Sequence, residues 1–266
     1  MAYFADRCIR AHRCTSLCPH GAITLLDDGR PMTDWAICRE RCYNAAEPPY
    51  ACTTRCHSGA RKTIGALVTV REVLTEVLKD SSIYQESGGG ITLSGGEPMN
   101  QVPFVRDLLC AAKEHWLHTA IETCGYAAWT SFESVLEYVD FVFLDLKVLD
   151  PIRHEDLTGQ GNQVILQNAP RIAEFMRRRG GRVVVRIPIV PGLTDSADNV
   201  ESIADFVRER MPGVGTIELM PYHRLGRGKY ADIGMTYFLD GLVPPTEGAM
   251  NRLREILTGR GFTLTY

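Results

Sequence analysis

The segment VDFVFLDLK, residues 139–147, decides the fold of this chain. Its apolar run is typical of a buried strand, and successive side chains of a strand point to opposite faces of a sheet. Asp145 and Lys147 therefore share a face with Phe141 and Phe143, at the carboxyl end of the strand. The segment predicts a core strand that presents an acid and a base at one edge of a sheet.

Strand-like and helix-like segments alternate on both sides of this strand. The other expected strands cover residues 88–96, 118–125, 182–192 and 216–223. Apolar stripes at helical spacing predict helices over 69–80, 104–112, 131–138, the stretch before Gly180, 200–207 and 247–261, the last closed by Gly259. Thr69 and Glu72 have the spacing of a capping box at the start of the first helix. Repeated strand–helix units predict parallel strands joined by right-handed crossovers.

Composition narrows the class of protein. The 266 residues are 45% hydrophobic and 23% charged, without an apolar run long enough to span a bilayer or an apolar signal segment at the start. The net charge of −3 is too small to indicate nucleic acid or an anionic membrane as a partner, and we expect a cytoplasmic protein. Residues 1–62 are net basic and residues 63–266 are net acidic, which favours two parts with different roles.

Seven of the nine cysteines lie between Cys8 and Cys56. In a reducing compartment such a concentration indicates a metal site rather than disulfides. The first group reads C-x2-A-x2-C-x3-C-P, in which Ala11 replaces the second cysteine of the bacterial ferredoxin pattern. The second group is Cys38, Cys42, Cys52 and Cys56, stretched by the insert YNAAEPPYA.

The crossed ligation of two-cluster ferredoxins divides these cysteines into two sets. One cluster takes Cys18, Cys38, Cys42 and Cys52, and the other takes Cys8, Cys14 and Cys56, with the position of Ala11 empty. We expect the first cluster to be a four-iron cube. The second is a three-iron cluster, or a cube whose fourth iron takes His12, water or an exogenous ligand. Structural zinc, disulfides and a decaying module without the second cluster remain as alternatives.

Polar residues gather near the expected carboxyl ends of the strands, where parallel α/β proteins place their chemistry. They are Gly95, Gly96, Glu97, Thr123, Asp145, Lys147, Arg186 and His223. Ordinary alternatives exist: a turn for SGGEP, a structural ion pair for Asp145 with Lys147, and a strand-end histidine without function for His223. Arg186 follows three valines, so its charge needs a partner.

Taken together, these segments resemble the glycyl-radical-enzyme activating enzymes, a branch of the radical S-adenosylmethionine superfamily. The resemblance covers nearly the whole chain, through TLSGGEPMNQ, HTAIETCGYA, VFLDLK, HEDLTGQGN, VVVRIPIVPGLTDS and IELMPYHRLGRGKY. It implies an α/β fold: a partial (β/α)6 barrel over residues 63–266, here without its first strand, preceded by an α+β ferredoxin-like two-cluster module over residues 1–62. Pyruvate formate-lyase activases and the activases of dehydratases or decarboxylases are the most similar members.

The resemblance also implies roles at the matching positions. The segment that holds the methionine amino group of S-adenosylmethionine corresponds to Ser94, Gly95, Gly96, Glu97 and Pro98. The positions near or contacting that cofactor correspond to Asp145, Lys147, Arg186 and His223. Glu122 and Thr123 match a cation-site pair of some members, although glutamate stands there in place of aspartate.

The implied reaction is the reductive cleavage of S-adenosylmethionine, after which a 5′-deoxyadenosyl radical removes hydrogen from a glycine of the partner, a glycyl radical enzyme. The implied electron donor is a flavodoxin or a ferredoxin. The cube that cleaves the cofactor needs a C-x3-C-x2-C motif, which occurs nowhere in the 266 residues; after Cys14 and Cys18, Gly21 stands where the third cysteine belongs. We therefore assign no catalytic residue and expect the chain as printed not to cleave S-adenosylmethionine.

Two explanations of the missing motif compete. We favour the explanation that the native protein is longer over the explanation that it is truncated. A sheet without its first strand should have an exposed edge and low stability. The rival interpretation is an iron–sulfur electron-transfer or binding protein, or one half of a split activase whose other chain supplies the cysteines.

Overall fold

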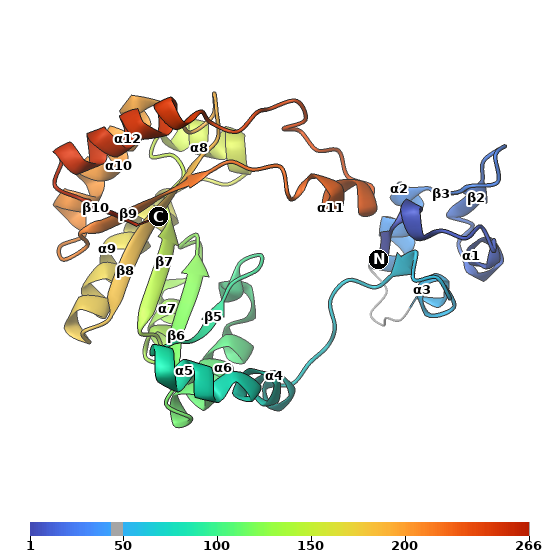
Figure 1. Cartoon of the computed structure of the whole chain (residues 1–266), viewed down its shortest axis with the longest axis horizontal. Helices are drawn as coiled ribbons and strands as arrows, with labels where there is room; N and C mark the ends of the chain where they lie inside the picture. The colour runs from blue at the N-terminus through green and yellow to red at the C-terminus, as the bar shows by residue number, and fades with distance from the viewer. Residues whose placement is uncertain (44–49, 266) are drawn as a thin grey trace. The chain divides into compact units, whose positions relative to one another are not determined.

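A computed structural model describes residues 1–43 and 50–265, so most of the insert YNAAEPPYA lies outside the described residues. The chain forms two compact units (Figure 1). The cysteine unit comprises Met1–Leu67 and His223–Leu242, and the sheet unit comprises Val68–Tyr222 and Val243–Tyr266. The division expected at residue 62 stays a prediction.

The sheet unit is built on six strands that are parallel at every pairing. They are β5 (Gly90–Leu93), β6 (His118–Thr123), β7 (Phe141–Asp145), β8 (Arg182–Ile189), β9 (Thr216–Pro221) and β10 (Thr263–Thr265), and they adjoin one another in chain order. The five strands expected from the sequence are confirmed, and so is the mixed α/β class with parallel strands. The sequence analysis missed β10, because a three-residue strand with exposed ends carries too short a pattern to recognise.

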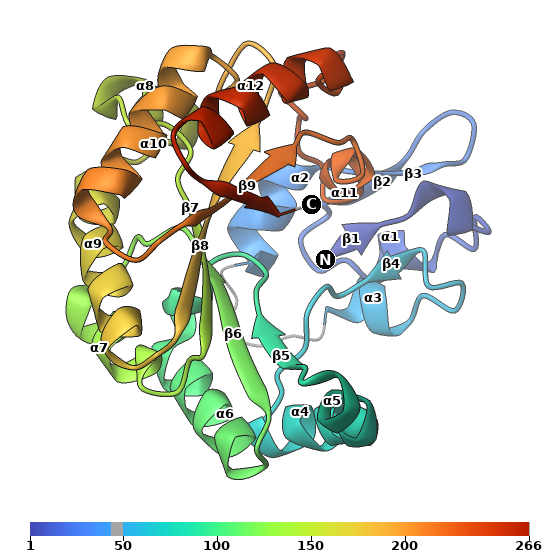
Figure 2. The same cartoon turned by 60° about the vertical axis from the view of Figure 1, so that its left-hand side comes forward.

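Helices pack along one face of this sheet, as Figure 2 shows. They are α4 (Val70–Val77), α5 (Ser81–Ser87), α6 (Val102–Glu114), α7 (Trp129–Leu136), α8 (Pro151–Thr158), α9 (Gln163–Arg178), α10 (Ala197–Arg210) and α12 (Glu247–Gly259). The continuous core between sheet and helices includes Ile121, Val142, Val185 and Ile217, all fully buried. Because one face is filled in this way, polar side chains of the strands are left to the opposite face and to the strand ends.

The helix boundaries agree with the sequence signals in most places. Thr69 accepts a hydrogen bond from the Glu72 backbone and Glu72 reaches back to Thr69, which confirms the capping box. The last helix, α12, ends at Gly259 as expected, but the residue with positive φ is Gly261, at 86°. The short helices α5 and α8 were not expected. Among the described residues, no helix is long and apolar enough to cross a membrane.

The cysteine unit has little regular structure and almost no apolar core. It contains β1 (Ala2–Tyr3), η1 (Ala5–Arg7), α1 (Arg13–Leu17), β2 (Ile23–Leu25), β3 (Pro31–Thr33), α2 (Trp35–Cys38), η2 (Arg39–Tyr43), α3 (Ala51–Thr54), β4 (Arg61–Lys62) and α11 (Arg227–Asp232). β1 pairs with β4 and β2 with β3, both antiparallel. The buried cluster is formed by Met1, Ala22 and Cys38, with Cys18, Trp35, Cys42, Tyr50 and Cys52 packed against it. Cysteines thus take the place that larger apolar side chains hold in an ordinary small domain.

A segment distant in sequence completes this unit. Residues 223–242 join it through the Arg39 guanidinium, whose Nη2 donates to the Gly234 carbonyl oxygen at 2.5 Å. Gly234 packs so closely on the Trp35 ring that a Cβ there would lie 2.1 Å from it. No sequence signal predicted this return of the chain, because one glycine and one arginine in a loop carry no periodicity.

An ion pair at the amino end of β7 makes a first prediction. Lys113 Nζ lies 2.8 and 2.7 Å from the two carboxylate oxygens of Asp140, which also accepts from the Thr119 backbone at 2.9 Å. Burial alone would raise the pKa of Asp140, but these contacts outweigh it and hold the pKa below its ordinary value. Asp140→Asn should therefore lower the free energy of unfolding by about 1–2 kcal/mol at pH 7, measured by urea denaturation.

The pH dependence of this loss has a definite sign. Because the folded-state pKa of Asp140 is depressed, its contribution is complete above the unfolded value of about 3.9 and disappears as the pH falls through the folded value. The difference between wild type and Asp140→Asn should shrink as the pH is lowered below about 4. A difference that stays constant over that range would contradict the assignment.

Candidate functional site

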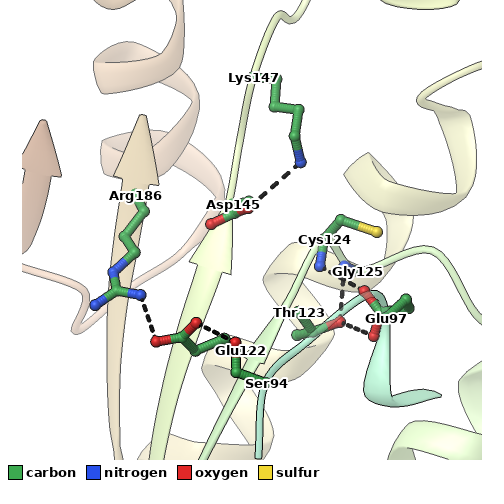
Figure 3. A network of polar contacts seen from close by, with 9 residues as sticks. All are labelled: Ser94, Glu97, Glu122, Thr123, Cys124, Gly125, Asp145, Lys147 and Arg186. Carbon is green, nitrogen blue, oxygen red and sulfur yellow. Dashed lines mark hydrogen bonds and ion pairs between the residues drawn. The ribbon is translucent and has the colours of Figure 1, made fainter. Parts of the chain in front are cut away.

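The carboxyl ends of β5 to β8 bring together most of the polar residues that the sequence singled out (Figure 3). Ser94 and Glu97 follow β5, Glu122 and Thr123 end β6, and Asp145 ends β7. Lys147 comes two residues after β7, and Arg186 lies in β8. These side chains form three separate sets of contacts at the edge where the sequence placed them: Ser94 with Glu122 and Arg186, Glu97 with Thr123, and Asp145 with Lys147.

Arg186 lies at the centre of a charged triad. Its Nε is 2.6 Å from Glu218 Oε2 and its Nη1 is 2.8 Å from Glu122 Oε1. The guanidinium carbon lies 3.6 Å from the centroid of the Phe143 ring, so the ring supports the cation between the two acids. Glu218 is the residue directly opposite Arg186 on β9. Its place in the alternating sequence pattern of that strand gave no indication that it would pair with Arg186. The partner that Arg186 needed is thus a pair of glutamates, one of which the sequence analysis missed.

The Glu122 carboxylate is held on both sides. Ser94 Oγ donates to one of its oxygens at 2.5 Å and Arg186 donates to the other. Burial alone would raise the pKa of Glu122, but these two donors outweigh it and keep the pKa below its ordinary value. Glu122 is therefore an anion at neutral pH, and its charge is already paired with Arg186 of the same chain.

Asp145 and Lys147 form a looser pair on the neighbouring strand. Lys147 Nζ lies 3.4 Å from Asp145 Oδ2, and about a third of each side chain is exposed. Burial raises the pKa of Asp145 in spite of the nearby cations Lys147 and Arg186. The long distance and the exposed lysine leave Lys147 able to turn toward an anionic or polar ligand.

Glu97 ties two loops together. Its Oε1 accepts from Thr123 Oγ1 at 2.8 Å and from the Met99 backbone at 3.1 Å, and its Oε2 accepts from the Cys124 backbone at 2.8 Å. Gly95, just before it, has a φ of 122°, which favours glycine, and Pro98 begins the short helix η4 (Pro98–Gln101). The SGGEP segment is therefore a rigid turn in which Glu97 positions backbone as well as facing the site.

A pocket of about 240 Å³ opens beside this group. Its lining includes Glu97, Cys124 and Lys147 from the strand ends, with Tyr126 and His154 from the following elements. The His154 ring is buried, and its Nδ1 lies 2.8 Å from the Gln160 carbonyl oxygen. Tyr126 and His154 were not assigned from the sequence. The pocket offers a carboxylate, a lysine and hydroxyl groups to a small polar ligand.

His223 was predicted to join this site. It is exposed and begins the segment 223–242, which belongs to the cysteine unit and not to the sheet unit. Its role stays a prediction.

The cysteine unit contains two pockets that gather thiols. The Cys8 pocket, about 70 Å³, is lined by Cys8, Ala11, Cys14, Cys52 and Cys56 among others. The Cys38 pocket, about 350 Å³, is lined by Cys18, Cys38, Cys42 and Cys52 among others. Apart from Cys52, which borders both, the division follows the crossed spacing rule.

The chemistry of these donor sets suits multi-iron clusters. Several soft thiols converge on each pocket and stand where a small domain would need an apolar core, which is the situation of a cofactor-dependent fold. Over the described residues, no three His, Cys, Asp or Glu side chains are arranged to hold a single metal ion. The residues fit iron–sulfur clusters, whose number and type stay a prediction.

Ala11 and His12 occupy the position of the missing ligand. Ala11 lines the Cys8 pocket, whereas His12 is turned so that its Nε2 lies 2.8 Å from the Gly29 carbonyl oxygen. This nitrogen is engaged by the backbone, and ligation by His12 would require the other ring nitrogen or a change of rotamer.

The model of the radical SAM superfamily matches residues 38–207. The isethionate sulfite-lyase activating enzyme of Oleidesulfovibrio alaskensis is 41% identical over 93% of this chain and 75% of that protein. The chain is a member of the glycyl-radical-enzyme activating enzymes of the radical SAM superfamily.

Other members are similar over comparable lengths. The 4-hydroxyphenylacetate decarboxylase activating enzyme of Clostridioides difficile is 32% identical over 93% of this chain and 75% of that protein. The choline trimethylamine-lyase activating enzyme of O. alaskensis is 31% identical over 99% and 82%. A solved domain of a pyruvate-formate lyase-activating enzyme from Bacteroides vulgatus has a TM-score of 0.55 and 26% identity, covering 66% of this chain and 98% of that one. Family membership, anticipated from the sequence, is confirmed.

Proposed function

We propose that this activase takes part in the reductive cleavage of S-adenosylmethionine and in the removal of hydrogen from a glycine of a partner glycyl radical enzyme. The observation that carries the proposal is the polar group at the carboxyl ends of β5 to β8, in a chain of this family. Relatives in this family are named as the activating enzymes of isethionate sulfite-lyase, 4-hydroxyphenylacetate decarboxylase and choline trimethylamine-lyase. The proposed partner is therefore a glycyl radical enzyme of the same kind.

The chain's own residues have distinct tasks in this proposal. Lys147, partly exposed in the lining of the 240 Å³ pocket, binds the carboxylate end of S-adenosylmethionine. The turn from Ser94 to Pro98 holds the amino group, with Glu97 fixing the turn. Arg186, engaged by two glutamates, positions Glu122 and so shapes the floor of the site. For His223, the proposed role as a cofactor contact rests on the family resemblance alone.

We further propose that the sheet unit is a partial (β/α) barrel and that the cysteine unit is a ferredoxin-like module with two iron–sulfur clusters. The all-parallel sheet with helices along one face supports the first part, and the two thiol-lined pockets support the second. When bound, the clusters supply one-electron transfer. The thiols hold them, and an electron donor such as a flavodoxin or ferredoxin delivers the electrons.

The 266 residues contain no C-x3-C-x2-C triplet, and this favours one specific second candidate. In it, the chain is an electron-transfer protein or one half of a split activase, and another polypeptide supplies the three cysteines. Both candidates predict cofactor binding or cluster binding, but only a complete site releases 5′-deoxyadenosine from S-adenosylmethionine under a strong reductant. We expect the 266-residue chain alone to release none.

Lys147→Met tests the cofactor site without requiring turnover. Loss of a charge-assisted hydrogen bond of about 1.5–3 kcal/mol should weaken S-adenosylmethionine binding roughly ten-fold or more, measured by isothermal titration calorimetry under anaerobic conditions. The matched control is Lys113→Met, which breaks the lysine–aspartate pair at the amino end of the same strand. Equal affinities of the two variants would contradict the assigned site.

Partner choice is tested separately. The chain, supplemented with a polypeptide that carries the cysteine triplet, is mixed with S-adenosylmethionine, reductant and either isethionate sulfite-lyase or choline trimethylamine-lyase. A glycyl radical signal in electron paramagnetic resonance (EPR) spectra supports the proposal and identifies the partner. Release of 5′-deoxyadenosine with no glycyl radical in either lyase would leave the cleavage intact and reject these two partners.

A further inference from the structure

Arg61 is the only residue in the described part of the chain that combines a charge with almost complete burial and unsatisfied nitrogens. Its exposed fraction is 2%, and its Nε and Nη2 have no hydrogen-bond partner among the described residues. Its Nη1 donates to Thr33 Oγ1 at 2.8 Å, and the guanidinium lies 4.5 Å from the centroid of the Tyr3 ring. Both of these neighbours are uncharged, and among the residues that the structure describes the buried cation forms no ion pair.

Such an arrangement is unfavourable unless an anion is near. Removing an ion from water costs several kcal/mol, and a cation–π contact with one neutral hydrogen bond recovers only part of that. An aliphatic side chain would fill the same space without the penalty. A buried arginine with two orphaned nitrogens therefore points to a negative charge that the described residues do not provide.

The groups around Arg61 that can become anionic are cysteines. Its backbone nitrogen lies 3.3 Å from Cys56 Sγ, in the Cys8 pocket. On the other side, Arg61 Nη1 lies 3.9 Å from Met1 Sδ, and Met1 lines the Cys38 pocket and packs with Cys38. Arg61 therefore adjoins both sets of cysteines.

We propose that Arg61 is the internal counter-ion of the two iron–sulfur clusters and that it raises their reduction potentials. The inference rests on the proposed loading of the cysteine unit with clusters. A cluster held by thiolates is anionic and gains one more negative charge on reduction, so a fixed cation in a water-poor interior stabilises the reduced form more than the oxidised form. The orphaned Nε and Nη2 are also donors available to sulfur atoms, which shifts the potential in the same direction.

The test uses the full 266-residue chain, reconstituted anaerobically with iron and sulfide. Arg61→Met removes the charge and keeps most of the side-chain volume, whereas Arg61→Lys keeps the charge. Arg7→Met is the matched control, because Arg7 belongs to the same unit and stacks on the Phe4 ring at 4.6 Å but is exposed. The readouts are the iron and sulfide content and the midpoint potential of each EPR signal in a redox titration.

We expect Arg61→Met to shift the midpoint potentials of both clusters to more negative values and to release iron faster in the presence of a chelator. Arg61→Lys and Arg7→Met should stay close to wild type in both respects. If Arg61→Met cannot retain its clusters, Arg61→Lys decides the question. Wild-type potentials in Arg61→Lys support the counter-ion role, whereas loss of the clusters in Arg61→Lys as well overturns it.

Failure of this inference can be told from failure of the proposed function. Wild-type protein that binds no iron after reconstitution overturns the two-cluster proposal and this inference together. Normal iron content with unchanged potentials in Arg61→Met overturns the counter-ion role alone and leaves the clusters in place.

Discussion

Replacing Arg186 with alanine is expected to lower the free energy of unfolding by about 3 kcal/mol. The side chain is 15% exposed and lies between Glu218, 18% exposed, and Glu122, 34% exposed. Removing the cation leaves two carboxylates facing each other over the Phe143 ring without a counter-charge, and breaking a buried ion pair from one side is strongly destabilising. The partial exposure of Glu122 places the expected loss at the lower end of that range.

The chain offers a close control for this change. Arg182 begins the same strand, β8, and its guanidinium lies 5.4 Å from the centroid of the Phe141 ring. It therefore has a ring contact like that of Arg186. Arg182 is exposed, however, and lacks the two glutamates. Arg182→Ala should cost less than about 1 kcal/mol in urea denaturation. The double variant Arg186→Met with Glu218→Gln should recover part of the loss. Similar losses for the two alanine variants would show that the triad contributes little.

The size of the Arg186 effect should also depend on pH. In the wild type, the lowered pKa of Glu122 means that its stabilising contribution is complete above the unfolded value of about 4.3 and is lost as the pH falls through the folded value. In Arg186→Ala, protonation of Glu122 relieves its repulsion with the neighbouring Glu218. The difference between wild type and variant should therefore be largest near pH 7 and should become smaller below about pH 4.

Much of this site was predictable because parallel topology is predictable. Apolar runs such as VDFVFLDLK identified five strands. Parallel strands place their carboxyl ends at one edge, so Asp145, Lys147 and Arg186 had to meet there. The three valines before Arg186 indicated that its charge would need a partner. The identity of that partner depends on the register of β8 against β9, which sets Glu218 opposite Arg186 and which no local pattern encodes.

Other features depend on contacts that sequence reasoning does not reach. Arg61 reads as an ordinary basic residue in the pair Arg61–Lys62, and only the packing of β1, β3 and β4 around it shows that it is buried. The grouping of the cysteines followed from spacing, since a proline after Cys18 turns that residue away from Cys14.

Cys14 and Cys18 give the strongest test of that grouping. Cys14 lies in the short helix α1 and Cys18 directly follows that helix, four residues later, yet Cys14 lines the Cys8 pocket and Cys18 lines the Cys38 pocket. If ligation is crossed, serine at each position should remove a different cluster: Cys18→Ser the four-cysteine cube and Cys14→Ser the cluster next to Ala11. Each variant should lose roughly half of the bound iron after anaerobic reconstitution.

The EPR spectra separate this outcome from a general loss of folding. Cys18→Ser should lose the four-iron signal of the reduced protein and keep the signal of the other cluster, which is of three-iron type in the oxidised protein if the position of Ala11 is unfilled. Cys14→Ser should show the reverse. Cys110→Ser, on α6 of the sheet unit, is the control and should keep both signals. Loss of the same signal in both variants would contradict crossed ligation, because neighbouring cysteines of one loop would then serve one cluster; loss of neither would exclude both as ligands.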